Sequence, residues 1–306
     1  MELKGKVIRS TGSWSNVLID TNDVVECKLR GNFRIKGIRS TNPVAVGDIV
    51  SIEKDAKDPT KGVIVSIANR RNYLIRRSVN LSKQTHIIAA NVDQLIVLAT
   101  LTEPRTSLGF IDRLLVTSEA YEIPASIVFN KADLMNPESS EELRSIREIY
   151  EKVGYHTFSV SAKDGTGLTD LMDEMKDKVS LIAGHSGVGK STLINTIEPG
   201  LDLKVKQLSD AHLKGTHTTT FAEMFRLSFG GFIIDTPGLK EFGMVDMDDD
   251  NVGHYFPEIF KFSEHCRFND CKHKNEPGCA VLKALDRNDI ASSRYRTYLG
   301  ILTELD

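Results

Sequence analysis

The first 70 residues alternate apolar and polar positions over short stretches, which is the pattern of half-buried β-strands. Turn-forming Gly, Asn, Asp and Pro residues separate these stretches. The stretches cover residues 5–10, 15–21, 23–31, 47–53 and 62–70. Five short strands predict a small antiparallel barrel. We expect an OB-fold, although any small β-barrel with a solvated basic surface fits the same pattern.

From about residue 73 to residue 245, continuous apolar runs alternate with amphipathic stretches. The runs predict strands at 94–100, 125–130, 156–161, 180–184 and 231–236, with helices at 107–122 and 139–154. Alternating strands and helices indicate an α/β domain with a mainly parallel sheet that is covered on both faces. Ligands bind such sheets beyond the carboxyl ends of the strands, where Gly or Asx residues follow several of these runs.

The remaining residues are first acidic, then rich in Cys and His, and then helical over residues 279–305. We therefore expect three domains along the chain. They are a β-barrel over residues 1–72, an α/β domain over residues 73–245 and a mostly helical C-terminal domain over residues 246–306.

The composition is that of a soluble globular protein, with 40% hydrophobic and 26% charged residues among 306. The first ten residues are polar and basic, unlike a signal peptide, and the longest apolar run, residues 95–101, is too short to span a bilayer. Three of the four cysteines lie close together near the C-terminus, which favours a metal site over disulfides. We expect a cytoplasmic monomer without membrane contact.

An eight-residue segment, GHSGVGKS at residues 184–191, has the form of a phosphate-binding loop between a strand and a helix. Its backbone N–H groups and the start of the helix would face an anion. Lys190 can reach the β- and γ-phosphates, and Ser191 can bind Mg²⁺. The expected nucleotide contacts are Gly184, His185, Ser186, Gly187, Val188, Gly189, Lys190, Ser191 and Thr192. The plain alternative is a Gly-rich turn, and a true loop fits an ATPase, a small-molecule kinase or a GTPase.

The segment NKAD at residues 130–133 favours guanine. Guanine presents N1–H and N2–H₂ donors on one edge, which the Asp133 carboxylate can accept, whereas adenine has no such donor pair. Asn130 can bind the base and brace the loop, and the stem of Lys131 can cover the ring. Four residues alone are a weak signal, since a loop with Asx turns has the same sequence.

Further segments follow predicted strands in the same domain. Ser161, Ala162 and Lys163 can direct backbone N–H groups at the guanine oxygen. In the segment DTPG, Asp235 can hold the Mg²⁺ shell and Gly238 can sense the γ-phosphate.

A threonine run at residues 216–220 lies between the phosphate loop and DTPG. In GTPases a threonine at this point completes the Mg²⁺ shell, and Thr218 or Thr219 is the candidate here. The run does not tell which of them serves, and each can also be a plain loop residue.

The order of these segments is unusual. GTPases ordinarily run from phosphate loop through threonine and DxxG to NKxD and SAK, whereas here NKAD and SAK come first. We interpret residues 73–245 as a circularly permuted P-loop GTPase domain, which is possible because domain termini lie at the surface and are often close together.

The segment HCRFNDCKHKNEPGC places three cysteines and a histidine in a short polar stretch. Three thiolates and one imidazole form a closed tetrahedral site for one structural Zn²⁺. The predicted ligands are Cys266, Cys271, His273 and Cys279, and His265 is the competing nitrogen ligand. Cys27 stands apart in a predicted strand.

The net charge of −3 hides an asymmetry. Residues 1–80 carry 15 Lys and Arg against 8 Asp and Glu, a balance of +7, so the rest carries −10. A basic segment on an acidic chain suggests a polyanionic partner, and RNA suits a basic OB-fold face, although a solvated basic surface fits too. The basic residues include Lys28, Arg30, Arg34, Lys36 and Arg39, with Phe33 among them and four arginines in residues 70–78.

The permuted order, the segment GTHTTT, the strand-rich N-terminus and the Cys/His cluster together resemble the ribosome small-subunit-dependent GTPases of the RsgA/YloQ/YjeQ family. The resemblance covers essentially the whole chain. It implies an OB-fold, a permuted GTPase domain and a zinc-binding domain. It also implies late maturation of the 30S subunit, 16S rRNA as partner, GTP/GDP with Mg²⁺, and hydrolysis stimulated by that subunit.

Leu239 follows DTPG, where many GTPases carry a glutamine that orients the attacking water. Leucine has no donor or acceptor, so we expect slow intrinsic turnover. His217 is the internal candidate to orient or deprotonate water, beside Lys190, Thr218 and Thr219 as catalytic groups, but it can also be an exposed loop histidine. The competing functions are an RNA-binding GTP/GDP sensor and, less well matched to NKAD and SAK, an ATP-dependent kinase.

Overall fold

A computed structural model describes residues 2–11, 13–30, 43–77, 85–201, 222–235 and 249–305. The chain divides into two compact units, each built from segments that are distant in sequence. The first unit comprises Met1–Leu95, Thr169–Ala183 and Ile194–Gly243, and the second comprises Ile96–Leu168, Gly184–Leu193 and Met244–Asp306. The domain boundaries after residues 72 and 245 stay predictions.

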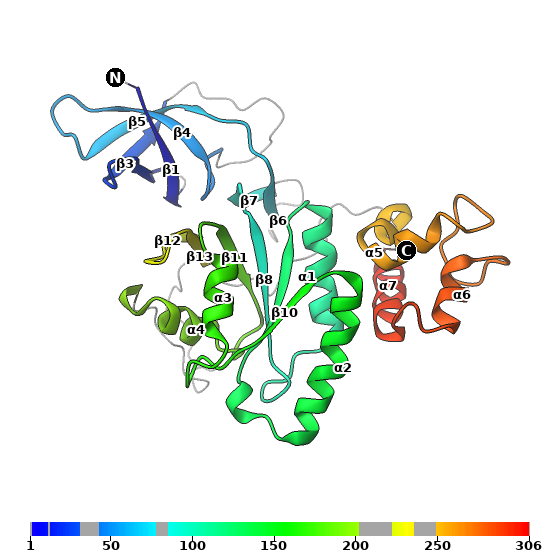
Figure 1. Cartoon of the computed structure of the whole chain (residues 1–306). Coiled ribbons are helices and arrows are strands. Elements are labelled where there is room, and N and C mark those ends of the chain that lie inside the picture. The colour runs from blue at the N-terminus through cyan, green and yellow to red at the C-terminus, as the bar shows by residue number, and fades with distance from the viewer. Residues whose placement is uncertain are drawn as a thin grey trace, which may run out of the picture. The chain divides into compact units, whose positions relative to one another are not determined.

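The first unit begins with a five-stranded barrel (Figure 1). Buried and exposed side chains alternate along its strands. Its strands are β1 (Glu2–Ser10), β2 (Ser15–Ile19), β3 (Val24–Leu29), β4 (Ile49–Lys54) and β5 (Lys61–Ile67). The strand order β1-β2-β3-β5-β4 closes because β4 also pairs with β1. The five predicted strands are confirmed, but β3 and β5 run parallel, so the expectation of antiparallel pairs throughout is wrong there. Parallel pairing is possible because β4 intervenes in sequence between them.

The barrel core is apolar, and the first unit also contains a buried ion pair between Arg70 and Asp48. The core consists of Val7, Val17, Ile19, Val25, Cys27, Val44, Val50, Ile52 and Ile64. Arg70 donates to both carboxylate oxygens of buried Asp48, at 2.6 and 2.7 Å. Asp48 also accepts the Ala45 backbone N–H at 2.8 Å, so both of its buried carboxylate oxygens have partners.

The first unit also contains a hairpin that the sequence pattern did not reveal, and further strands and short helical elements from later in the chain. These elements are β6 (Tyr73–Arg77), β7 (Thr85–Ala90), α3 (Leu168–Met175), β11 (Val179–Ala183), β12 (Glu223–Arg226), β13 (Phe232–Asp235) and a short 3₁₀ turn at Pro199–Leu201. β11 pairs with β13 in parallel, and β12 pairs antiparallel with both β13 and β1. α4 (Lys190–Ile197) begins in the second unit and ends in the first.

The second unit holds the other parallel strands and their helices. They are β8 (Gln94–Ala99), whose first two residues belong to the first unit, α1 (Leu108–Ala120), β9 (Ala125–Phe129), a 3₁₀ turn at Ala132–Leu134, α2 (Pro137–Val153) and β10 (His156–Ser159). β9 and β10 pair in parallel from Ser126↔His156 to Phe129↔Ser159. Because both strands end at the same edge, the loops that follow them are brought together there.

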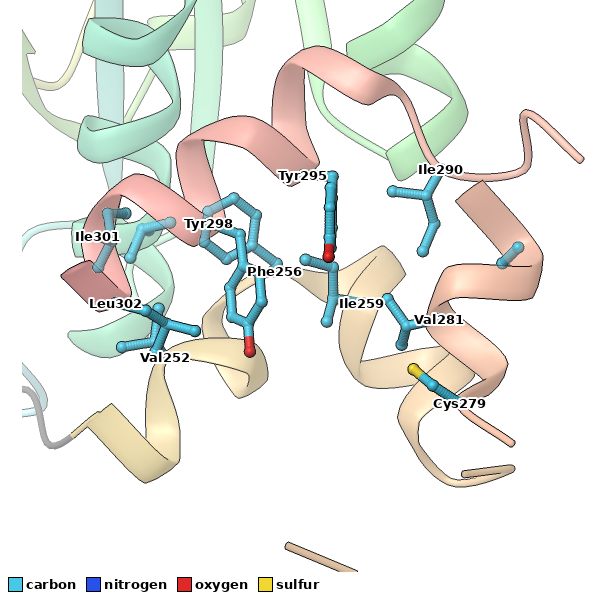
Figure 2. Packing of buried hydrophobic residues seen from close by; sticks show 12 residues of the cluster. Val252, Phe256, Ile259, Cys279, Val281, Ile290, Tyr295, Tyr298, Ile301 and Leu302 are labelled. Carbon is cyan, nitrogen blue, oxygen red and sulfur yellow. The ribbon is translucent and has the colours of Figure 1, made fainter. Parts of the chain in front are cut away.

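The C-terminal residues form short helices around one apolar core (Figures 1 and 2). The elements are a 3₁₀ segment (Asp249–Tyr255), α5 (Pro257–Ser263), α6 (Ala280–Asp286) and α7 (Ser292–Leu305). Phe256, Ile259, Val281 and Tyr298 are among the core side chains, and Val116 of α1 packs in the same cluster. In the part of the chain described here, no helix combines the length and apolar character needed to cross a membrane.

A buried charge network joins α1 to α5 and α7. Arg294 on α7 is fully buried and donates to both carboxylate oxygens of Glu258, at 2.6 and 3.0 Å. It also donates to Asp112 of α1 at 3.1 Å. Asp112 further accepts hydrogen bonds from Tyr150 and Thr297, at 2.9 and 2.7 Å. Each buried charge therefore takes part in at least two hydrogen bonds, as burial in a low-dielectric core requires.

Candidate nucleotide site and metal centre

Asn130 connects the three segments predicted to bind nucleotide in the second unit. It follows β9, is 1% exposed, and its backbone N–H donates to the Ala99 carbonyl at 2.8 Å. Its side-chain N–H₂ donates to the Val188 carbonyl of the phosphate loop at 3.0 Å. Its side-chain oxygen accepts the Ala162 N–H at 3.1 Å. The predicted bracing role of Asn130 thus has a geometric basis in this structure.

Asp133 lies one turn further on and is held from the SAK segment. The Ser161 hydroxyl donates to Asp133 Oδ1 at 2.9 Å, and Lys163 Nζ lies 3.7 Å from Oδ2. Ser161 is fully buried, whereas the Lys163 side chain is 79% exposed, so the serine is the firmer partner. A carboxylate fixed in orientation is suited to accept the paired donors of guanine.

The phosphate loop depends on glycines at positions that no other residue fits. Gly187 and Gly189 have φ values of +82° and +94°. A Cβ on Gly189 would lie 2.4 Å from Asn130 Nδ2, and one on Gly184 would lie 2.7 Å from the Leu98 carbonyl oxygen. Close backbone approach therefore fixes the loop conformation, and loops of this kind direct backbone N–H groups at an anion.

The helix that follows the loop starts at the residues predicted to contact phosphate and Mg²⁺. Lys190 opens α4, followed by Ser191 and Thr192, and the Leu193 N–H donates to the Gly189 carbonyl at 2.8 Å. The positive end of α4 therefore lies at the loop, where it favours phosphate groups.

Asp235 ends β13 in the first unit. Parallel pairing with β11, from Val179↔Phe232 to Leu181↔Ile234, puts Asp235 at the same sheet edge as the end of β11, from which the chain enters Gly184. Carboxylate and hydroxyl oxygens are donor types that suit Mg²⁺, and the Mg²⁺ roles predicted for Asp235 and Ser191 stay predictions. His217, Thr218, Thr219 and Gly238 lie outside the described residues, and their predicted roles stay predictions.

Two residues outside the predicted motifs also touch the site. Lys131, in a left-handed conformation with φ of 66°, donates from Nζ to the Glu103 carbonyl at 2.6 Å. His185 Nε2 lies 2.5 Å from Thr106 Oγ1. Glu103 and Thr106 follow β8, and their position after a parallel strand is the one signal in the sequence that points to them.

The four predicted metal ligands lie together in the C-terminal region. The ligand atoms of Cys266, Cys271, His273 and Cys279 all lie within 4.8 Å of one another. Cys266 Sγ and Cys279 Sγ are 3.9 Å apart, and His273 Nδ1 lies 3.6 and 3.4 Å from them. Tetrahedral zinc with Zn–S bonds of about 2.3 Å needs S···S edges of roughly 3.8 Å, so the cluster fits that ion. His265 is not a member of this cluster.

The surroundings of the cluster fix its ligands. Tyr295 donates to the His273 carbonyl at 2.6 Å, and Tyr298 donates to the Lys272 carbonyl at 2.8 Å. Burial raises the pKa of the Cys271 and Cys279 thiols and lowers the pKa of His273. A divalent cation favours both thiolates and a neutral imidazole, so it would compensate for the desolvation of the cysteines.

The basic region of the barrel is described only in part. Lys28 Nζ lies 4.4 Å from the centre of the Trp14 ring, and Arg30 pairs with Glu53 at 3.0 Å on the surface. Phe33, Arg34, Lys36 and Arg39 fall outside the described residues. The suggested RNA-binding face therefore stays a prediction.

Comparison with known proteins gives two family matches. Residues 67–245 match the family described as RsgA GTPase, and residues 4–64 match the family described as RsgA N-terminal domain. The first match alone covers more than half of the chain.

Relatives and solved structures agree with the family matches. The protein called small ribosomal subunit biogenesis GTPase RsgA from Bacteroides fragilis is 51% identical over 302 residues, which are 99% of this chain and 97% of that protein. Its namesake from Flavobacterium johnsoniae is 51% identical over 98% of this chain and 93% of its own. The crystal structure of YjeQ from Thermotoga maritima has a TM-score of 0.82 and 35% identity, covering 100% of this chain and 99% of that chain. YloQ, described as a circularly permuted GTPase, has a TM-score of 0.78 and 29% identity, covering 100% of this chain and 95% of that one.

Proposed function

The chain belongs to the RsgA family of GTPases, and on this premise we propose that it hydrolyses GTP during late maturation of the small ribosomal subunit. The observation that carries the proposal is the position of Asn130, whose amide contacts Val188 of the phosphate loop and Ala162 of the SAK segment. One side chain thus joins the segments suited to guanine with the loop suited to phosphate, as one nucleotide site requires.

The residues of the site divide the recognition of GTP between them. Asp133, oriented by Ser161, accepts the guanine N1–H and N2–H₂ groups. The phosphate-loop N–H groups and Lys190 bind the β- and γ-phosphates. Ser191 and Asp235 would hold Mg²⁺, which when bound neutralises charge that develops on the phosphate oxygens.

The sequence gives the least information about which residue orients the attacking water. Leu239 stands where many GTPases carry glutamine, and a leucine side chain can neither donate nor accept. His217 is our candidate for this role, with Thr218 or Thr219 completing the Mg²⁺ shell. We expect slow turnover by the free protein and stimulation by the small subunit, because a charged group supplied by a partner accelerates hydrolysis by roughly 10³–10⁵-fold in other GTPases.

The other parts of the chain suit a ribosomal role. The Cys/His cluster holds one structural zinc ion in our proposal, and the basic barrel contacts 16S rRNA through phosphates. A protein with these partners works in the cytoplasm, and we expect it to act as a monomer.

Phosphate release from GTP and ATP, measured with and without purified 30S subunits, tests the proposal. We expect slow GTP hydrolysis by the free chain, at least tenfold stimulation by 30S subunits, and no stimulated hydrolysis of ATP. Guanine-nucleotide binding without any stimulated phosphate release would instead indicate a GTP/GDP sensor, and a preference for ATP would contradict the guanine site itself. High salt should weaken subunit binding steeply if phosphate contacts dominate.

A further inference from the structure

Residues 100–107 link β8 to α1 and contact both halves of the nucleotide site. The Glu103 carbonyl accepts from Lys131 Nζ at 2.6 Å, beside the base-binding segment. Thr106 Oγ1 lies 2.5 Å from Nε2 of His185, which is the second residue of the phosphate loop. This connection carries no recognised nucleotide-binding motif, so its contacts call for a separate explanation.

The hydrogen bonds of His185 determine its neutral tautomer. Nδ1 lies 3.0 Å from the Ser186 carbonyl oxygen, which can only accept, so Nδ1 carries the proton. Nε2 is then an acceptor, and the Thr106 hydroxyl donates to it. The ring is also packed edge to face against Phe110 of α1, with centroids 5.6 Å apart. His185 is thus fixed by a directional bond and by an aromatic contact.

Thr106 is itself held firmly. Its side chain is almost fully buried, and its Oγ1 accepts the Thr100 backbone N–H at 2.9 Å. The Thr106 N–H donates to the Thr100 carbonyl at 2.8 Å, and the Thr100 hydroxyl donates to the Pro104 carbonyl at 2.6 Å. The hydroxyl that reaches His185 therefore projects from a connection braced by its own hydrogen bonds.

We propose that Thr106 is a positioning residue of the nucleotide site, which holds the phosphate loop through His185 in the conformation that binds the phosphates of GTP. This inference rests on the proposed function, since it assigns a role within the same site. A loop that is held before the ligand arrives loses less conformational freedom on binding, and so binds more tightly. Base selection, which depends on Asp133, should not depend on Thr106.

Fluorescent GDP binding to the full-length chain tests the proposal through Thr106→Val, which keeps the shape and removes the hydroxyl. We expect the Kd to rise by about 5–20-fold, the range given by loss of one buried hydrogen bond. The preference for GTP over ATP should stay unchanged. In subunit-stimulated turnover, KM for GTP should rise while kcat changes by less than about twofold. The contact stabilises the bound ground state and the transition state equally, so its loss weakens binding without slowing the chemical step.

Two variants separate positioning from general stability. Thr106→Ser restores a hydroxyl and should restore the Kd to within about twofold of wild type. Ser107→Ala removes the N-cap of α1, which accepts the Phe110 N–H, and so weakens the same connection without touching the phosphate loop. It should lower the melting temperature but leave nucleotide affinity unchanged.

Thr106→Val also removes the acceptor of the Thr100 N–H, so His185→Phe serves as the second variant if the first does not fold. It keeps an aromatic ring against Phe110 but cannot accept from Thr106, so the Kd should rise by about 5–20-fold. Where Thr106→Val folds, the double variant should show no further rise. Wild-type affinity in both folded variants, or equal weakening by Ser107→Ala, would overturn this inference alone. Absence of guanine-nucleotide binding by the wild-type chain would overturn the proposed function as well.

Discussion

The side-chain amide of Asn130 donates to the backbone carbonyl of Val188 at 3.0 Å, across 58 positions of the chain. Asn130 precedes the phosphate loop in sequence, whereas ordinary GTPases present the two segments in the opposite order. The bond does not depend on that order, because a cut elsewhere in the chain and a joining of the old ends leave the strands free to pack as before. Permutation changes the connections and leaves this contact possible.

Asn130→Ala should weaken guanine-nucleotide binding strongly. The change leaves the Val188 carbonyl and the Ala162 N–H without their side-chain partner, and the two losses together are worth about 2–5 kcal/mol. We expect at least about a 30-fold rise in the Kd for GDP by isothermal titration calorimetry. Asn136→Ala is the matched control, because Asn136 caps α2 at its N-terminus and should affect stability alone. Equal affinity of Asn130→Ala and wild type would contradict the bridging role.

Asp133→Asn should change the base that the site prefers. The amide keeps an oxygen for the Ser161 hydroxyl but presents N–H₂ where guanine also presents a donor. Xanthine carries a carbonyl at that position, so GDP affinity should fall by about 10²-fold or more while XDP affinity rises. Competition against fluorescent GDP measures both. Asp164→Asn is the control, because Asp164 accepts the Thr166 N–H in the neighbouring turn and should leave selectivity unchanged.

Removal of one cluster ligand should release zinc and loosen the C-terminal helices. Cys271→Ser breaks the set of four ligands, and the core in Figure 2 lies directly against it through Cys279. Elemental analysis should find about one zinc per wild-type chain and much less in the variant, with faster hydrogen exchange in α5 to α7. Cys27→Ala removes a cysteine outside the cluster and should retain full zinc. A wild-type protein purified without zinc, yet equally protected, would refute the assignment.

Arg294→Ala should destabilise the second unit severely. It leaves the carboxylates of Asp112 and Glu258 buried without their cation, a change that costs about 3–5 kcal/mol in comparable cores. Urea denaturation measures the loss. Arg113→Ala provides the contrast, because Arg113 pairs with Glu304 on the surface and should cost less than about 1 kcal/mol. Similar losses in the two variants would mean that burial of the network matters little.

Cys27 should make the barrel sensitive to alkaline pH. Burial, followed by the charge of Glu26, raises the pKa of Cys27 to about 11. A pKa raised above its unfolded value of about 8.5 means that the folded state favours the neutral thiol. The contribution of the neutral Cys27 thiol to the free energy of unfolding is complete below about pH 8.5 and is lost as the pH rises through 11. Melting temperatures at pH 8 and pH 11 should therefore fall less in Cys27→Ala than in wild type, and equal falls would contradict the assignment.

Much of the fold follows from local patterns in the sequence. The five barrel strands show the apolar–polar alternation of half-buried strands, and β8, β9 and β11 appear as the unbroken apolar runs of a sheet buried on both faces. The hairpin of β6 and β7 was missed because its segments show neither pattern clearly. The parallel pairing of β3 with β5 was also missed, since pairing partners are chosen by chain topology and not by the strands' own composition.

The sequence by itself determined which residues can bind guanine, phosphate and metal, because those chemistries require particular side chains at fixed spacings. Only the tertiary structure decided what holds those residues in place. Asn130 donates a hydrogen bond to the Val188 carbonyl, and Lys131 donates one to the Glu103 carbonyl. Both acceptors are backbone atoms, which every residue type supplies equally. Arginine is a residue type that usually lies on the surface. Arg294 is buried because two carboxylates from distant parts of the sequence form ion pairs with it. Such contacts arise from the packing of remote segments, and no local pattern records them.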